Sequence, residues 1–120
     1  MTSPQNEFVE YVREVMSHWA RVSSRKMFGG YGLYRDGLMF ALIAHETLYL
    51  KTDTTNLAQF EHAGSAPFVY QSTGRTVQLS YWSAPAECLE SPADMGVWCQ
   101  RAYAAALRSR TDPPRTRKAK

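Results

Sequence analysis

The chain contains 120 residues, of which 44% are hydrophobic and 21% are charged. These fractions are typical of a folded soluble domain, and a chain of this length suits one hydrophobic core. No apolar run approaches the roughly 20 residues that a membrane-spanning helix needs, so we expect no membrane contact. The N-terminus lacks a signal-peptide pattern, which predicts a cytoplasmic protein. Two cysteines, Cys88 and Cys99, cannot build a disulfide framework.

The net charge of +3 is distributed unevenly along the chain. Residues 108–120 hold six basic side chains and one acidic side chain, whereas residues 1–107 hold eight basic and ten acidic ones. Pro113 and Pro114 prevent a helix from continuing at that point. We therefore expect a folded domain over residues 1–107 and a disordered basic tail over residues 108–120.

Two interpretations of this tail stay open. In the first, the tail contacts nucleic-acid phosphates weakly and without sequence preference, because bound cations release counterions from the phosphate backbone. In the second, the tail is a solvated end that keeps the domain soluble, since no aromatic residue is interleaved with its charges. The cations that the first interpretation uses are Arg108, Arg110, Arg115, Arg117, Lys118 and Lys120.

Amphipathic helices are predicted at both ends of the domain. A Ser-Pro pair stands at residues 3–4 and again at residues 91–92, and it offers a capping hydroxyl followed by a proline at the first helical position. Residues 4–22 then show apolar side chains three and four positions apart, which indicates a helix with one buried face. A similar apolar stripe that includes Trp98 follows the second pair.

Five strands and a short helix are predicted between these two helices. Asp36-Gly37 is a typical two-residue hairpin turn, His45-Glu46 makes a second tight turn, and Gly64 ends a short helix in the left-handed conformation. The predicted strands are Lys26–Tyr34, Leu38–Ala44, Thr47–Thr52, Pro67–Gln71 and Thr76–Trp82. The sequence thus predicts an α+β domain of two layers, with a five-stranded antiparallel sheet, helices on one face and the order α-β-β-β-α-β-β-α.

The predicted strand Leu38–Ala44 is apolar on both faces, although a sheet with one face in water alternates apolar and polar residues. One explanation is a central strand that a helix or the connector at residues 83–90 covers on both sides. The other is that the uncovered face contacts another protein, because large exposed apolar patches mark interaction sites. That protein would be a different partner or a second copy of the chain in a homodimer.

No motif in the sequence predicts catalysis, a cofactor or a metal ion. The glycine-rich stretch Phe28–Gly32 leads into a strand, whereas phosphate-binding glycine loops lead into a helix. We interpret these glycines as a bulge, a bend or a site of close packing. The segment His45–Tyr49 lacks the second histidine of a zinc-protease helix, and no Cys or His pair has ligand spacing.

Three consecutive segments, Lys26–Tyr34, Asp36–Ile43 and Leu48–Asp53, closely resemble the N-terminal domain family of the TfoX/Sxy competence regulators. The resemblance extends over residues 8–107 and implies the same two-layer α+β fold, no enzymatic activity and no cofactor. The named members of the family are bacterial regulators that promote expression of DNA-uptake genes, and they are thought to act with a cyclic-AMP-responsive activator. Those regulators carry a second, C-terminal helical domain, whereas this chain ends in the basic tail.

From these observations we expect a regulatory module without enzymatic activity that binds a protein partner, such as a transcription regulator. The contact would lie on the outer face of the sheet and on its aromatic first strand, at Phe28, Tyr31, Tyr34 and Tyr49. The alternative is a weak, non-specific nucleic-acid binder that uses the tail. An enzyme is the least favoured interpretation, because the chain has no motif for a methyl-donor site.

Overall fold

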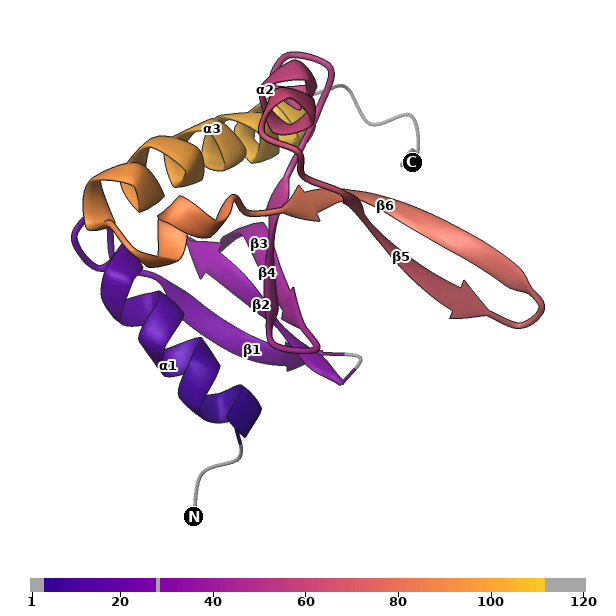
Figure 1. The fold of residues 1–120 in the computed structure, drawn as a ribbon, viewed down its shortest axis with the longest axis horizontal. Coiled ribbons are helices and arrows are strands. Elements are labelled where there is room, and N and C mark those ends of the chain that lie inside the picture. The colour runs from indigo at the N-terminus through magenta and orange to yellow at the C-terminus, as the bar shows by residue number, and fades with distance from the viewer. Residues whose placement is uncertain (1–3, 28, 112–120) are drawn as a thin grey trace.

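The computed structural model describes residues 4–27 and 29–111. Within these residues, three α-helices and one short 3₁₀ helix accompany a single antiparallel sheet of six strands (Figure 1). In chain order the elements are α1 (Pro4–Met16), β1 (Ser23–Met27), β2 (Gly30–Arg35), β3 (Leu38–Ala44), β4 (Thr47–Lys51), α2 (Leu57–His62), β5 (Pro67–Ser72), β6 (Arg75–Ser83), η1 (Ala86–Leu89) and α3 (Pro92–Thr111). The strand order in the sheet is β1-β2-β3-β4-β6-β5, so β1 and β5 form its two edges.

The prediction of five strands is wrong, because the predicted strand Lys26–Tyr34 is in fact two strands. β1 and β2 pair with each other in an antiparallel hairpin that starts at Met27 and Gly30. Gly29 lies between them with a φ of +78°, a left-handed conformation that glycine adopts without a Cβ clash. The glycine-rich stretch therefore contains a turn, and the observed order is α-β-β-β-β-α-β-β-α. The α+β class with one antiparallel sheet is confirmed.

Both terminal helices are present, with bounds that differ from the predicted ones. α1 ends at Met16, short of the predicted residue 22, and the N–H of Trp19 then donates to the Met16 carbonyl at 2.8 Å. This turn places Trp19 against α3, where a Cβ added at Gly96 would lie 3.6 Å from the Cβ of Trp19. α3 continues to Thr111, past the domain boundary expected at residue 107.

The predicted tight turns are confirmed. Asp36 and Gly37 have φ values of +51° and +79°, as a type I′ turn requires, and the twist of such a turn matches that of the adjoining strands. His45 and Glu46 form the turn between β3 and β4 in the same left-handed region, with φ values of +52° and +57°. Gly64, with a φ of +80°, follows the end of α2.

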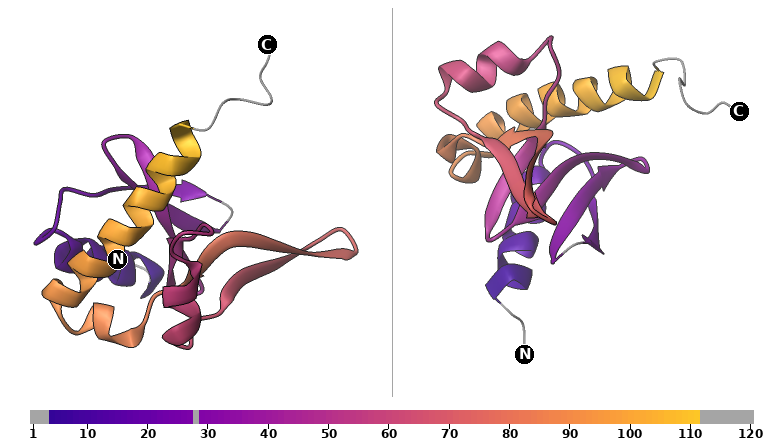
Figure 2. Two further views of the ribbon diagram at one scale, coloured as in Figure 1. Left: turned by 90° about the horizontal axis from the view of Figure 1, so that it is seen from above. Right: turned by 90° about the vertical axis from the view of Figure 1, so that its right-hand side faces the viewer.

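The hydrophobic core lies between one face of the sheet and the helices α1 and α3 (Figure 2). Phe60 of α2 joins this core through an edge-on contact with Trp98 of α3, with ring centroids 4.9 Å apart. The largest fully buried side chains are Phe40, Phe60, Met16, Leu33, Ile43, Leu50, Met95, Val12, Cys88 and Cys99. Strands β2, β3 and β4 contribute to this set, so the helices pack on the central strands of the sheet.

The hairpin of β5 and β6 projects away from the rest of the sheet (Figures 1 and 2). β4 pairs with β6 only at residues 81–83 of β6, so the distal part of the hairpin is two strands wide. We call residues 69–79 the β5–β6 arm. Val69 and Tyr70 in this arm are each 43% exposed.

Candidate interaction surface

The register of the strands divides the side chains of the sheet between two faces, because residues paired across antiparallel strands project to the same side. The pairs Tyr31–Ile43 and Leu33–Ala41 belong to the helix-covered core. The opposite side of the sheet is lined by apolar and aromatic residues that come from all six strands. We call this surface the outer sheet face, and its residues are Met27, Tyr34, Met39, Leu42, Tyr49, Phe68 and Tyr81.

A β-bulge in β3 decides which residues reach the outer sheet face. Leu33 pairs with Ala41 but Tyr34 pairs with Met39, so Phe40 is an extra residue without a partner in β2. Phe40 is fully buried in the core, while Met39 projects to the outer side with Tyr34. Strict alternation along β3 would have placed Met39 in the core.

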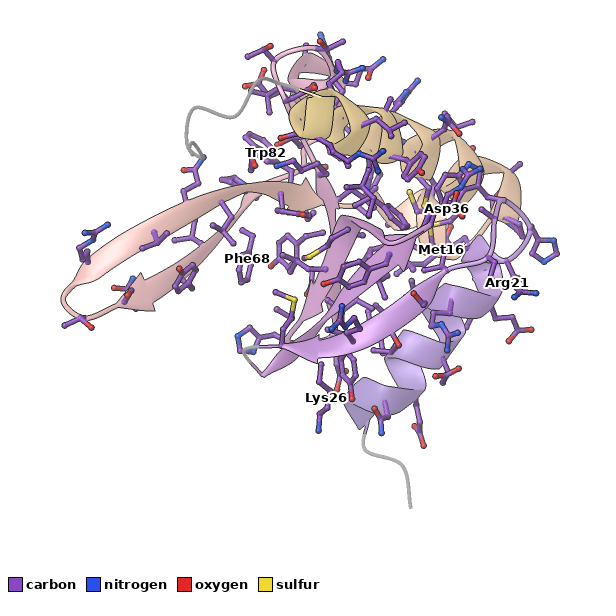
Figure 3. All side chains as sticks on the ribbon, turned by 180° about the vertical axis from the view of Figure 1, so that it is seen from behind. Met16, Arg21, Lys26, Asp36, Phe68 and Trp82 are labelled. Carbon is purple, nitrogen blue, oxygen red and sulfur yellow. The ribbon has the colours of Figure 1, made fainter. Side chains whose placement is uncertain are left out.

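Aromatic contacts join the outer sheet face to the base of the hairpin. The rings of Tyr49 and Phe68 meet edge-on with centroids 4.9 Å apart, and Phe68 stacks on Tyr70 at 6.1 Å. Phe68 points from the hairpin toward the neighbouring strands (Figure 3). Aromatic packing therefore holds the base of the hairpin against β4.

Two cations lie over rings of the outer sheet face. The Arg25 guanidinium lies 5.6 Å from the ring centroid of Tyr34, and the Lys51 Nζ lies 5.2 Å from that of Tyr81. Burial raises the pKa of Tyr81 to about 12, with the nearby Tyr34 as the second cause. Burial also lowers the pKa of Lys51, against the opposing effect of the Asp53 carboxylate. The outer sheet face is thus apolar, with the cations Arg25 and Lys51 lying over two of its rings, and it is only partly exposed to water.

Most of the outer sheet face is neither fully buried nor fully exposed. Leu42 is 6% exposed, while Met27, Tyr34, Met39 and Tyr49 have intermediate exposure. Side chains of this type in a half-covered layer are those that bury further apolar area when a second surface docks on them.

Gly30 and Gly32 have packing roles within this surface. A Cβ at Gly30 would lie 2.2 Å from the carbonyl oxygen of Ile43, which is a backbone clash. A Cβ at Gly32 would lie 2.8 Å from the Sδ of Met27 and 3.2 Å from the Sδ of Met39. The absence of side chains at these positions lets the strands and the two methionines approach closely, which agrees with the sequence-based interpretation of close packing.

The residues predicted for a partner surface fall in three places. Tyr34 and Tyr49 lie on the outer sheet face. Tyr31 lies on the helix-covered side, where it pairs with Ile43 and its hydroxyl donates to Asn6 Oδ1 of α1. Phe28 lies outside the described residues.

Five members of the outer sheet face were not among the predicted surface residues: Met27, Met39, Leu42, Phe68 and Tyr81. The alternation of apolar residues in β6 could have indicated that Tyr81 shares a face with its neighbours two positions away. The bulge in β3 and the turn at Gly29 have no comparable pattern in the sequence. Each of them changes which face of the sheet the following side chains occupy.

The predicted tail cations also divide into two groups. Arg108 and Arg110 lie in the last turns of α3, and Arg108 forms an ion pair with Asp53, with Nε 2.6 Å from Oδ2. The remaining cations of the set lie outside the described residues: Arg115, Arg117, Lys118 and Lys120.

The cysteine thiols in the described part of the chain are buried. Cys88 and Cys99 are free thiols with no exposed surface. Burial raises the pKa of Cys88 to about 12 and raises that of Cys99 further, so neither thiol forms a nucleophilic thiolate near neutral pH. Among residues 4–27 and 29–111, no three His, Cys, Asp or Glu side chains gather as metal ligands would.

The profile of the TfoX N-terminal domain matches residues 14–106. This chain belongs to the TfoX N-terminal domain family. All seven residues of the outer sheet face lie within the matched segment, so the surface is part of the domain itself.

A curated relative supports the same assignment. Over 95 residues the chain is 25% identical to the DNA transformation protein TfoX1 of Aliivibrio fischeri (strain ATCC 700601 / ES114). The aligned region covers 79% of this chain and 44% of the relative. The chain thus spans less than half the length of this TfoX protein. In the part of the chain that the structure describes, no helix is both long enough and apolar enough to cross a bilayer.

Proposed function

We propose that this TfoX N-terminal domain is a non-enzymatic regulatory module of the cytoplasm that binds a protein partner through the outer sheet face. The observation that carries the proposal is the apolar and aromatic layer on the side of the sheet opposite the core helices. Aromatic and methionine side chains are enriched at protein–protein interfaces, and methionine adapts to the shape of a partner. A transcription regulator is the partner class that a competence-related domain suits best.

The distribution of reactive groups supports a role without catalysis. The buried thiols of Cys88 and Cys99 are protonated at neutral pH. The Asp53 carboxylate accepts hydrogen bonds from Arg108 and from the backbone N–H groups of Thr55 and Asn56. Both of its oxygens therefore already have hydrogen-bond donors within the fold. A binding role needs none of these groups to react.

The relative's name, DNA transformation protein, directs the choice of experiment. We would delete the gene in its own bacterium and measure the frequency of transformation by added DNA. The deletion is expected to lower this frequency, and the wild-type gene is expected to restore it. If the deletion strain takes up DNA as well as the parent strain, the competence role is wrong.

Complementation with surface variants tests the binding face separately. Tyr34→Lys and Tyr49→Lys place a charge on the outer sheet face and are expected to fail in complementation. Val97→Lys is the control, since Val97 lies on α3 and is 50% exposed. Circular dichroism of each purified variant establishes that it is folded. Full activity of both folded outer-face variants would contradict the assignment of this face.

The second proposal is that the basic C-terminal residues add a weak, non-specific contact to nucleic acid. Its support is the excess of five positive charges over residues 108–120, beside a domain with a net negative charge. Arg110 is exposed at the end of α3 and available for such a contact. Arg108 is a weaker candidate, because its guanidinium is held by Asp53.

A further inference from the structure

We propose that two copies of this chain form a homodimer by antiparallel pairing of their β5 strands. β5 is an edge of the sheet, with β6 as its one neighbour in the described strand order. An edge strand presents a row of backbone N–H and C=O groups that can pair with another strand. The pairing would therefore need no rearrangement of either copy.

The two edges of the sheet differ in how they are protected. β1, the other edge, has the sequence SSRKM, and its Arg25 and Lys26 are charges of the kind that prevent edge-to-edge association. β5 has the sequence PFVYQS, with no charged residue and with proline only at its first position. Val69 and Tyr70 at its centre are each 43% exposed. The proline and the register shift of β5 both lie at its base, before Val69, so its distal part from Val69 to Ser72 is the edge segment that lacks the usual protection.

A further strand would stabilise the β5–β6 arm. A hairpin of two strands is at best marginally stable in water, and three or more strands are needed for a stable sheet. The arm is two strands wide beyond the residues where β4 pairs with β6, and it projects into solvent (Figure 1). Pairing of two β5 strands would convert two such hairpins into one four-stranded antiparallel sheet.

The charge of the arm fits a second copy as the occupant. Arg75, at the tip of the hairpin, is the one charged residue in residues 66–82. In an antiparallel pair the two strands run in opposite directions, so the two tips lie at opposite ends of the interface. The two Arg75 side chains would be far apart, and no like charges would oppose each other along the paired strands.

The symmetry of this pairing has a consequence for the outer sheet face. Two antiparallel strands that are related by a two-fold axis have that axis perpendicular to the sheet, so corresponding faces lie on the same side. The outer sheet faces of the two copies would then be continuous through Phe68 and Tyr70 at the junction. The dimer does not depend on the proposed partner, because it is a property of the purified chain.

Sedimentation equilibrium of the purified full-length chain tests the pairing. As its concentration is raised to about 100 μM, the wild-type chain is expected to reach twice the mass of one chain. Val69→Lys would place two new positive charges at the interface and is expected to raise the dimer dissociation constant by about 10-fold or more. Val97→Lys is the matched control, since Val97 is a 50% exposed valine on α3, and it is expected to leave the dimer unchanged.

A second measurement locates the contact. In the wild-type chain, backbone N–H groups of β5 that point away from β6 are expected to be protected from hydrogen exchange, and Val69→Lys is expected to remove this protection while β3 stays protected. A monomeric wild-type chain would overturn the proposal. So would a dimer that persists unchanged in both Val69→Lys and Tyr70→Lys, because its contact would then lie elsewhere.

Discussion

Arg108 and Asp53 form a two-point ion pair between segments that are 55 residues apart in the sequence. The Arg108 Nε donates to Asp53 Oδ2 at 2.6 Å, and its Nη2 donates to Oδ1 at 3.0 Å. Asp53 precedes α2 and Arg108 lies near the end of α3, so the pair ties these two helical segments together. The Arg108 hydrogen bond is the main cause that lowers the pKa of Asp53.

Replacement of Arg108 is expected to destabilise the fold modestly. The side chain of Arg108 is 42% exposed, so solvent screens the pair, and Arg108→Ala should lower the free energy of unfolding by about 1 kcal/mol. Arg110→Ala is the control, because Arg110 is an exposed arginine on the same helix. Urea unfolding at neutral pH measures both changes. Equal effects of the two substitutions would show that the pair adds no stability.

The stability that Asp53 contributes is expected to disappear in acid. Because the pKa of Asp53 is lowered on folding, its carboxylate stabilises the folded state above the unfolded pKa, which is near 3.8. This contribution is lost as the pH falls through the folded pKa. The difference in unfolding free energy between wild type and Asp53→Asn should therefore be largest at pH 7 and smaller at about pH 3, below the unfolded pKa. In the Arg108→Ala background the pH-dependent difference should be smaller, and a difference that is the same at both pH values would contradict this account.

Alanine substitutions at the two β2 glycines are expected to differ in severity. Gly30→Ala puts a Cβ 2.2 Å from a backbone carbonyl oxygen, so the strands must separate, and the expected loss is about 3 kcal/mol or more. Gly32→Ala meets the flexible Sδ ends of Met27 and Met39, which can move, and about 1 kcal/mol is expected. Thermal unfolding of both variants gives the order. Equal stability of the two would show that the close strand approach at Gly30 has little energetic weight.

The nucleic-acid proposal predicts weak binding that is strongly dependent on salt. Fluorescence anisotropy with a labelled DNA duplex should show an affinity that falls steeply as salt rises and does not depend on the DNA sequence. A chain that ends at Thr111 keeps Arg108, Arg110 and the described part of α3, and it is the informative truncation. This truncated chain is expected to lose most of the affinity. Undiminished binding by the truncated chain would exclude the basic residues that follow Thr111 as the contact.

Most of the elements and the tight turns could be predicted from the sequence because their signals are local, although one strand was missed. Asp36-Gly37 and Gly64 carry the conformational preference of their turns in their own residue types. The turn at Gly29 was missed because the apolar and aromatic residues around it read as one continuous strand. Only the pairing of Met27 with Gly30 shows that the chain reverses there.

The outer sheet face was predictable in part. The apolar character of both faces of β3 indicated a second layer, and Tyr34 and Tyr49 belong to it. Tyr31 could not be separated from them by sequence, because its side depends on the hairpin at Gly29. The exchange of Met39 and Phe40 between faces follows from the β3 bulge, which is a property of strand pairing and not of local sequence.

The measurement that tests the central claim most directly is photo-crosslinking in living cells. A benzophenone amino acid in place of Tyr49 keeps an aromatic side chain on the outer sheet face, and the same residue in place of the exposed Val97 on α3 is the control. The proposed partner contact predicts a discrete, reproducible crosslinked protein from position 49 and none from position 97. If position 49 gives no crosslink, or both positions give the same products, the outer sheet face is not the binding surface.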